Sequence, residues 1–439
     1  MSPSDDKPSV IVIGGGFAGL AAVQSLKRAD VRITLIDRRN HHLFQPLLYQ
    51  VATGELSPSN IASPLRSILN RQPNAQVLLG EVTDISLADQ QVQMNDQALH
   101  YDYLIVAAGS SHHYFGNDHW SELAPGLKTV ENATEIRRRI LTAFETAERC
   151  QDPVEVAEQL TFVIVGAGPT GCELAGAIAE VAFHSMARDF RSIDPQQTRV
   201  VLIEPSENPM HFYPPPLPQR THRDLTALGV EVLCGYHVKQ IEPTEVVLSS
   251  TTDLPDKTIR TRTVVWAAGV QAVPMGETIS RQAGVERKRS GRVVVGPDVS
   301  IEGHSNVFVC GDLASLETAE HGELPCLAPV ASQMGRHAGR CIIADAKGKP
   351  RKPFHYFDRG SLAVIGRYRA VGTIRNFKVQ GFVAWFLWLF VHLMYITRFR
   401  NRILVLVQWG WTFLTRDRSS RLITNAPSTV VERPVKKVD

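Results

Sequence analysis

The stretch that decides the fold is residues 10–19, which read VIVIGGGFAG and lie close to the start of the chain. Val10 to Ile13 form a short, wholly apolar run, as expected for a buried strand of a parallel sheet. Three glycines then follow in the spacing G-x-G-x-x-G: Gly14, Gly16 and Gly19. We therefore expect a strand that runs directly into a glycine-rich turn.

The residues after this turn complete a βαβ pattern. A helix is expected over Leu20–Ala29 and a second strand over Val31–Ile36, which ends in Asp37. In a dinucleotide-binding unit the glycines permit a tight turn, close approach of a pyrophosphate and close helix packing, while the acid binds a ribose hydroxyl. The order of the pieces favours dinucleotide binding over the alternative of a plain glycine turn.

A second unit repeats the arrangement. The apolar run Phe162–Val165 leads into Gly166, Gly168 and Gly171, and a later run, Val200–Ile203, ends in Glu204. A carboxylate at this place favours NADH, because it repels the additional phosphate of NADPH. Two sites in one chain suggest FAD with NAD(P)H. The alternative is a doubly wound domain that binds no nucleotide.

Three further runs end in small or acidic residues where a cofactor could lie. Leu104–Gly109 and Val264–Gly269 both end in Ala-Ala-Gly, and these small residues leave room for a cofactor at the carboxyl edge of a sheet. The third, Asn306–Asp312, ends in an acid that could accept hydrogen bonds from ribityl hydroxyls. Asp312 as the N-cap of a helix that starts at Leu313 is an equal alternative.

One segment carries a more specific resemblance. Residues 40–54, NHHLFQPLLYQVATG, are similar to the signature of type II NADH dehydrogenases, the non-pumping NADH:quinone oxidoreductases of the two-dinucleotide-binding flavoprotein superfamily. The resemblance extends from Val10 to about Thr415. It implies oxidation of NADH and two-electron reduction of a membrane quinone of the ubiquinone or menaquinone type, through FAD and without proton pumping. It also suggests a homodimer.

The resemblance implies roles for individual residues. Residues expected to bind FAD are Gly14, Gly16, Phe17, Ala18, Gly19, Asp37, Arg38, Gln45, Ala108, Gly109, Gly311 and Asp312. Residues expected to bind NADH are Gly166, Gly168, Gly171, Glu204 and Gly269. Glu173 matches the family glutamate close to the nicotinamide and flavin, and is expected to be catalytic.

Gln333 is the other expected catalytic residue. The family often shows two glutamines four residues apart, followed by a third. Here Gln333 matches the second, whereas Pro329 and Met334 stand in place of the others. The resemblance implies that Gln333 donates to a quinone carbonyl; a plain helix-surface residue is the alternative.

The C-terminal part is apolar and basic. Val379–Thr397 contains 19 uncharged residues, and a second apolar run covers Ile403–Thr415. From Arg398 onward there are nine Lys and Arg against three Asp and Glu. Tryptophans next to arginines suit the headgroup region of a bilayer. We expect helices lying in the membrane surface, with a single span or a buried dimer interface as alternatives.

Composition disfavours nucleic-acid-binding, metal-binding and secreted proteins. The net charge of +3 is too small to suggest a nucleic-acid partner. The six cysteines lack metal-binding or redox-motif spacing, so we expect free thiols and no metal site. Met1–Ser9 is polar, and no signal peptide is expected.

The expected architecture is α/β, with two Rossmann-like domains and a C-terminal membrane-binding helical extension. The FAD domain would comprise 1–124 and 292–350, the inserted NADH domain 125–291, and the C-terminal domain 351–439, with membrane helices at about 379–415. The expected location is the cytoplasmic face of the inner membrane. The competing functions are a sulfide:quinone oxidoreductase, an NAD(P)H-dependent reductase of another acceptor such as an iron–sulfur protein, and a nucleotide-holding sensor without turnover.

Overall fold

The computed structural model describes residues 7–95, 97–252, 254–375 and 377–424. The start of the polar N-terminus (1–6) and the last part of the basic tail (425–439) lie outside these residues. The chain forms two compact units: the first comprises 1–43, 62–113 and 269–359, and the second comprises 44–61, 114–268 and 360–439. These units are defined by internal contacts, so the expected limits of the nucleotide-binding domains stay a prediction.

The first unit is built on a six-stranded sheet. Its strand order is β20 (Ser300–Ile301), β21 (His304–Val309), β9 (Tyr103–Val106), β1 (Ser9–Ile13), β2 (Arg32–Asp37) and β5 (Ala75–Leu79). All neighbouring strands are parallel except β20 and β21. The strands expected from the apolar runs are therefore confirmed, and their carboxyl ends share one edge.

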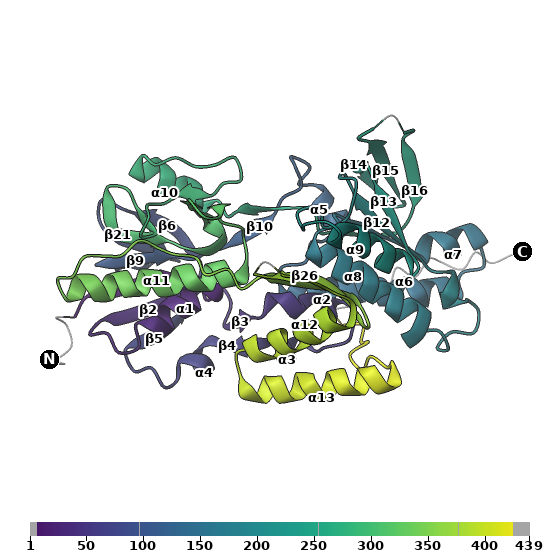
Figure 1. Cartoon of the computed structure of the whole chain (residues 1–439), viewed down its shortest axis with the longest axis horizontal. Coiled ribbons are helices and arrows are strands. Elements are labelled where there is room, and N and C mark those ends of the chain that lie inside the picture. Colours follow the sequence, from purple (N-terminus) through teal and green to yellow (C-terminus); the bar gives the residue numbers. More distant parts are fainter. Residues whose placement is uncertain (1–6, 96, 253, 376, 425–439) are drawn as a thin grey trace, which may run out of the picture. The chain divides into compact units, whose positions relative to one another are not determined.

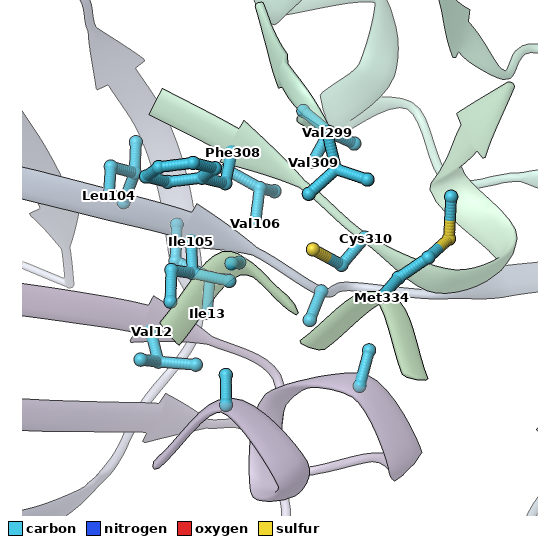
Figure 2. Packing of buried hydrophobic residues seen from close by; sticks show 14 of the residues in the cluster. Val12, Ile13, Leu104, Ile105, Val106, Val299, Phe308, Val309, Cys310 and Met334 are labelled. Carbon is cyan, nitrogen blue, oxygen red and sulfur yellow. The ribbon is translucent and has the colours of Figure 1, made fainter. Parts of the chain in front are cut away.

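Helices α1 (Phe17–Ser25) and α11 (Ala328–Ala346) pack closely against each other in this unit (Figure 1). A Cβ added at Gly335 of α11 would lie 1.9 Å from the carbonyl oxygen of Ala18, so a larger residue would push the helices apart. Figure 2 shows part of the buried core of this unit, to which Val12 of β1, Phe308 of β21 and Met334 of α11 all belong. This packing holds the glycine turn before α1 in a fixed place.

The expected helix over Leu20–Ala29 is wrong at both ends. Helix α1 starts at Phe17, directly after Gly16, because the glycine turn itself supplies the first helical turn. It ends at Ser25, and the next residues form short turns in which the Ala29 amide donates to the Leu26 carbonyl at 3.0 Å. The helix amides therefore begin at the turn itself.

The second unit contains a four-stranded parallel sheet. Its order is β13 (Val230–Cys234), β12 (Arg199–Glu204), β11 (Thr161–Val165) and β17 (Thr263–Trp266). Its helices include α6 (Val130–Arg149), α7 (Pro153–Gln159), α8 (Pro169–Glu180) and α9 (Leu217–Thr226). The second expected βαβ pattern is thus confirmed as β11, α8 and β12.

Antiparallel sheets supplement the two parallel ones. The first unit carries β6 (Val82–Ser86), β7 (Gln91–Met94) and β8 (Gln97–His100), and the second carries β14 (Tyr236–Glu242), β15 (Glu245–Ser250) and β16 (Lys257–Arg260). A third such sheet, β25 (Ser361–Gly366), β26 (Arg369–Ile374) and β27 (Phe377–Gln380), opens the C-terminal part of the second unit.

Two apolar helices end the described chain. Helix α12 (Gly381–Tyr395) packs on the sheet of β25, β26 and β27, and α13 (Phe399–Thr415) lies beside α12 (Figure 1). The short helix α2 (Leu48–Ala52) of the signature segment and α3 (Pro58–Ile61), which follows that segment, belong to the same unit. Within the described ranges, no helix combines the length and apolar character needed to cross a bilayer.

Candidate functional site

The first glycine turn requires glycine for steric reasons. Gly14 has φ +98°, and a Cβ there would lie 2.3 Å from the carbonyl oxygen of Ala107. A Cβ at Gly19 would lie 1.8 Å from the carbonyl oxygen of Gly14. By contrast, no atom lies within 4 Å of a Cβ built at Gly16. Two glycines thus close the turn, and the third leaves open space in front of α1.

Asp37 fixes this turn from the end of β2. Its Oδ2 accepts a hydrogen bond from the Gly15 amide at 2.5 Å, and its Oδ1 accepts from the Arg39 amide at 2.7 Å. Helix α1 has Gly16 as its N-cap and no side-chain cap, so its first amides have no side-chain acceptor. Uncapped helix amides next to open space are suited to bind a phosphate group.

The second glycine turn has the same geometry. Gly166 has φ +97°, and a Cβ at Gly171 would lie 1.8 Å from the carbonyl oxygen of Gly166. Gly168 is the N-cap of α8, again without a side-chain cap and with open space. Glu204 at the end of β12 accepts from the Ala167 amide at 2.9 Å and from the Ser206 amide at 3.1 Å. This turn fits a second dinucleotide.

The ends of β9 and β21 add polar groups in the first unit. Asp312 accepts a 2.6 Å hydrogen bond from the Ser110 hydroxyl. It lies within a short 3₁₀ helix, Gly311–Leu313, whose N-cap is Cys310, so the alternative of Asp312 as an N-cap is wrong. Gly109 has φ +77° with open space around it. The structure therefore places these residues at neighbouring strand ends.

The remaining expected cofactor residues occupy varied surroundings. Phe17 contacts His42 edge-on, with ring centroids 5.1 Å apart, and Arg38 is exposed after β2. Gln45 belongs to the second unit, where its Nε2 donates to the carbonyl oxygen of Lys128 at 3.2 Å. Gly269 has φ +88° and follows β17. Ala18 is buried, and Ala108 is partly buried.

Glu173 is a buried carboxyl on α8. Only 9% of its surface is exposed, and burial raises its pKa well above the usual range. The backbone amide of Val364, which lies 3.4 Å from its Oε1, and the side chain of Trp388 oppose that rise. No cationic side chain pairs with Glu173 in the described part of the chain. A carboxyl in this environment holds a proton at a pH where an exposed one has lost it.

Two tyrosines near Glu173 were not predicted from the sequence. Burial, with the Glu173 charge as a smaller cause, raises the pKa of Tyr49 well above its usual range. The same two causes raise the pKa of Tyr213 to about 12, and its hydroxyl lies 2.7 Å from that of Ser361. The resemblance implies that the segment from Phe44 to Tyr49 passes close to the flavin ring, but it gives the Tyr49 hydroxyl no role.

Gln333 lies on α11 and is partly buried. Its Nε2 donates to the carbonyl oxygen of Phe357 at 3.1 Å, and its Oε1 accepts from the Phe357 amide at 2.9 Å. Both ends of the amide are therefore tied to one backbone residue. The second hydrogen on Nε2 remains available to an acceptor.

Arg418 was also missed. It is 3% exposed, and its Nη2 lies 3.0 Å from Glu180 and 3.9 Å from Glu55. Burial raises the pKa of Glu55, and Arg418 opposes that rise. The chain after α13 is therefore anchored inside the second unit by a buried charge cluster.

Comparison with known proteins agrees with this geometry. Residues 8–335 match the family model of the pyridine nucleotide-disulphide oxidoreductases, and residues 359–417 match that of the NDH2 C-terminal domain. The chain is 45% identical, over 95% of its length and 90% of the relative, to the type II NADH:quinone oxidoreductase Ndh of Mycobacterium tuberculosis.

Two solved structures share the fold. NDH2 from Plasmodium falciparum in complex with NADH superimposes with a TM-score of 0.87 at 18% identity, covering 95% of this chain and 100% of that one. The sulfide:quinone oxidoreductase of Aquifex aeolicus superimposes with a TM-score of 0.71 at 18% identity, covering 94% of this chain and 92% of that one. With its two glycine turns and its full-length similarity to the mycobacterial enzyme, the chain belongs to the type II NADH:quinone oxidoreductase family.

Proposed function

We propose that this protein oxidises NADH and reduces a membrane quinone, with FAD as the electron carrier. The observation that carries this proposal is the pair of glycine turns, which have the same geometry on two separate parallel sheets. FAD, when bound, accepts two electrons from NADH and passes them to an acceptor. The protein's contribution is to bind and orient the reactants and to exclude water.

FAD is assigned to the first turn and NADH to the second. In the first unit, Gly16 and the uncapped amides of α1 would hold the pyrophosphate, and Asp37 would bind a ribose. In the second, Gly168, α8 and Glu204 would do the same for NADH. The Ser110–Asp312 pair would meet the ribityl hydroxyls.

Glu173 is proposed to take part on the acceptor side. Because burial raises its pKa, the carboxyl keeps a proton to higher pH than an exposed glutamate does, and can deliver it where the quinone needs one. Replacement of Glu173 by Gln keeps the shape and removes the proton. We expect slower quinone reduction with unchanged NADH oxidation; if both half-reactions of the variant run at the wild-type rates, this role is wrong.

Helices α12 and α13 are proposed to lie in the membrane surface. Their inner faces are buried, with Trp388 and Trp409 facing inward. Their outer faces expose large apolar side chains: Phe382, Val383, Phe386, Phe390, Met394, Tyr395, Phe399, Ile403, Leu404, Leu406, Val407, Trp411 and Leu414. A helix that is apolar on all sides needs a cover other than water, and lipid provides it next to the compartment where a quinone dissolves.

Basic residues favour one lipid surface. Arg400 and Arg416 lie at the two ends of α13, where each would attract anionic lipid with about 1 kcal/mol. This supports binding to the cytoplasmic face of the inner membrane. The homodimer implied by the resemblance also stays a prediction, which sedimentation of the detergent-solubilised protein would check.

A sulfide:quinone oxidoreductase is disfavoured by the cysteines. Such chemistry needs thiols that ionise near the flavin. Cys310 and Cys172 are fully buried, and burial raises the pKa of each thiol. Cys326 is exposed, and no other cysteine lies close to it in the sequence. The likeness to the sulfide enzyme therefore supports the fold alone.

The test follows flavin absorbance without oxygen. NADH and then a short-chain quinone are added to the purified, detergent-solubilised protein. We expect NADH to bleach the flavin rapidly and quinone to restore it. If the flavin bleaches but quinones do not restore it, the acceptor is different; if NADH fails to bleach it, the proposed function is wrong.

A further inference from the structure

Three buried side chains form a hydrogen-bonded chain from helix α13 to the neighbourhood of Glu173. The indole Nε1 of Trp409 donates to Oε1 of Gln50 at 2.8 Å, and Nε2 of Gln50 donates to the hydroxyl oxygen of Tyr49 at 3.1 Å. Trp409, Gln50 and Tyr49 are 8%, 4% and 5% exposed. Water therefore does not compete strongly for these bonds.

The donors and acceptors of this hydrogen-bonded series run in one fixed direction. An indole N–H can only donate, so Trp409 requires the oxygen end of the Gln50 amide. The NH₂ end must then face Tyr49, whose oxygen accepts the bond. If the amide were flipped, two donors would face each other and a buried N–H would lose its acceptor, at a cost of about 1–3 kcal/mol. Because Trp409 fixes the orientation of the Gln50 amide, the Tyr49 oxygen accepts from Gln50. The hydrogen of the Tyr49 hydroxyl is then left to donate to another group.

That proton has no acceptor among the described residues, although carboxyls lie near. Of the neighbouring carboxyls, Glu173 has the largest electrostatic effect on Tyr49, followed by Glu55 and then Glu180. Burial is the main cause that raises the pKa of Tyr49, so the hydroxyl keeps its proton. A buried hydroxyl that must donate, and has nothing to donate to, suits a ligand whose oxygen only accepts.

We propose that Trp409 and Gln50 are positioning residues that aim the Tyr49 hydroxyl to donate a hydrogen bond to a quinone carbonyl oxygen. Both quinone oxygens are pure acceptors, which the chain's polarity requires. Helix α13 would then serve the reaction as well as the lipid contact. This inference rests on the proposed function, whose Glu173 lies in the same part of the second unit.

Two substitutions test the direction of the chain. Trp409→Phe keeps a buried ring but removes the N–H that orients Gln50. Gln50→Glu accepts from Trp409 as before, but its ionised form cannot donate to Tyr49, whereas its protonated form can. The control is Trp120→Phe, which alters a buried tryptophan (4% exposed) on α5 (Trp120–Leu123) in the same unit.

The two half-reactions are measured separately by stopped flow in detergent, where lipid binding plays no part. We expect quinone reoxidation of the flavin to slow at least fivefold in Trp409→Phe, with NADH reduction within twofold of wild type and Trp120→Phe unchanged. For Gln50→Glu we expect a larger loss at pH 8 that diminishes toward pH 5.5. Each rate is divided by the wild-type rate at the same pH, because the neighbouring carboxyls Glu173, Glu55 and Glu180 are present in both proteins.

The outcomes separate this inference from the proposed function. If Trp409→Phe reoxidises as fast as Trp120→Phe, the positioning role of Trp409 is wrong. If the Gln50→Glu ratio is the same at every pH, the argument from bond direction is wrong, since a purely structural defect would not recover on protonation. In both cases the wild type stays active, whereas an inactive wild type would refute the proposed function instead.

Discussion

The two glycine turns are nearly identical in backbone geometry, yet they are supported differently. Each has a first glycine with φ near +97°, a third glycine whose Cβ would lie 1.8 Å from the first carbonyl, and an acid that holds the turn amide. Around the first, Asp37 precedes Arg38 and Arg39; around the second, Glu204 precedes Pro205 and Ser206. The backbone geometry is thus shared, and the residues after the acid distinguish the two turns.

The surroundings of the turns differ further. Strand ends beside the first turn contribute the Ser110–Asp312 pair, which suits a cofactor with a polyol chain. Helix α8 beyond the second turn carries the buried Glu173. If FAD binds at the first turn and NADH at the second, as proposed, the first unit retains the cofactor and the second serves turnover. The following substitutions would separate these two tasks.

The largest effect is expected from Gly19→Ala and its counterpart Gly171→Ala. In each, the new Cβ would meet a backbone oxygen at 1.8 Å, so the helix must move away from its turn. We expect Gly19→Ala to be purified with at least tenfold less flavin. A tenfold weaker affinity corresponds to a loss of about 1.4 kcal/mol in the free energy of FAD binding. Gly171→Ala should retain its flavin and show a KM for NADH raised at least tenfold. Flavin loss in both variants would show that the units are not independent.

A smaller effect is expected from Glu204→Ala. The buried amide of Ala167 loses its acceptor, which costs about 1–3 kcal/mol. The KM for NADH should rise about tenfold, and the preference for NADH over NADPH should narrow because the repelling charge is gone. Steady-state kinetics with both nucleotides measures this. An unchanged ratio of the two would contradict the assignment of Glu204 to the ribose.

Glu173 should make stability depend on pH. Its pKa is raised in the folded state, so the unfolded chain ionises first as pH rises above about 4.5. The free energy of unfolding of the wild type then falls, by at most about 1.4 kcal/mol per pH unit, until the folded carboxyl also ionises. Glu173→Gln lacks this loss. Denaturant unfolding from pH 5 to 8 should show that the free energy of unfolding of the variant increases relative to that of the wild type as pH rises. A difference that stays constant with pH would contradict this.

The smallest effect is expected from Ser110→Ala. It removes the 2.6 Å bond to Asp312 while leaving the glycine turn intact. The dissociation constant for FAD should rise about fivefold, equivalent to about 1 kcal/mol. Fluorescence titration of the flavin-free protein measures this. NADH binding should not change, and if it does, the pair does not belong to the flavin side.

The sequence was sufficient for the turns because their chemistry is local. Glycine spacing, the apolar strand and the terminal acid all lie within one βαβ unit, and β1, β2, β11 and β12 confirm them. The ends of α1 were misplaced because a glycine turn can act as the helix start, which apolar periodicity does not reveal.

The rest of the site depends on contacts between distant residues. Gln50 and Trp409 are 359 positions apart, and nothing at either position indicates the bond that joins them. Gln333 was predicted to face a quinone, but its two bonds to the Phe357 backbone could not be foreseen from a motif. Its role toward the quinone stays a prediction.

The buried cluster around Arg418 has a consequence for fragments of the enzyme. A protease that cuts after Arg416 would release Arg418 and leave Glu180 and Glu55 without their cation inside the second unit. Breaking a buried ion pair in this way costs about 3–5 kcal/mol. Removing the C-terminus would therefore not leave an intact catalyst, because the residues that follow α12 and α13 also complete the interior of the second unit.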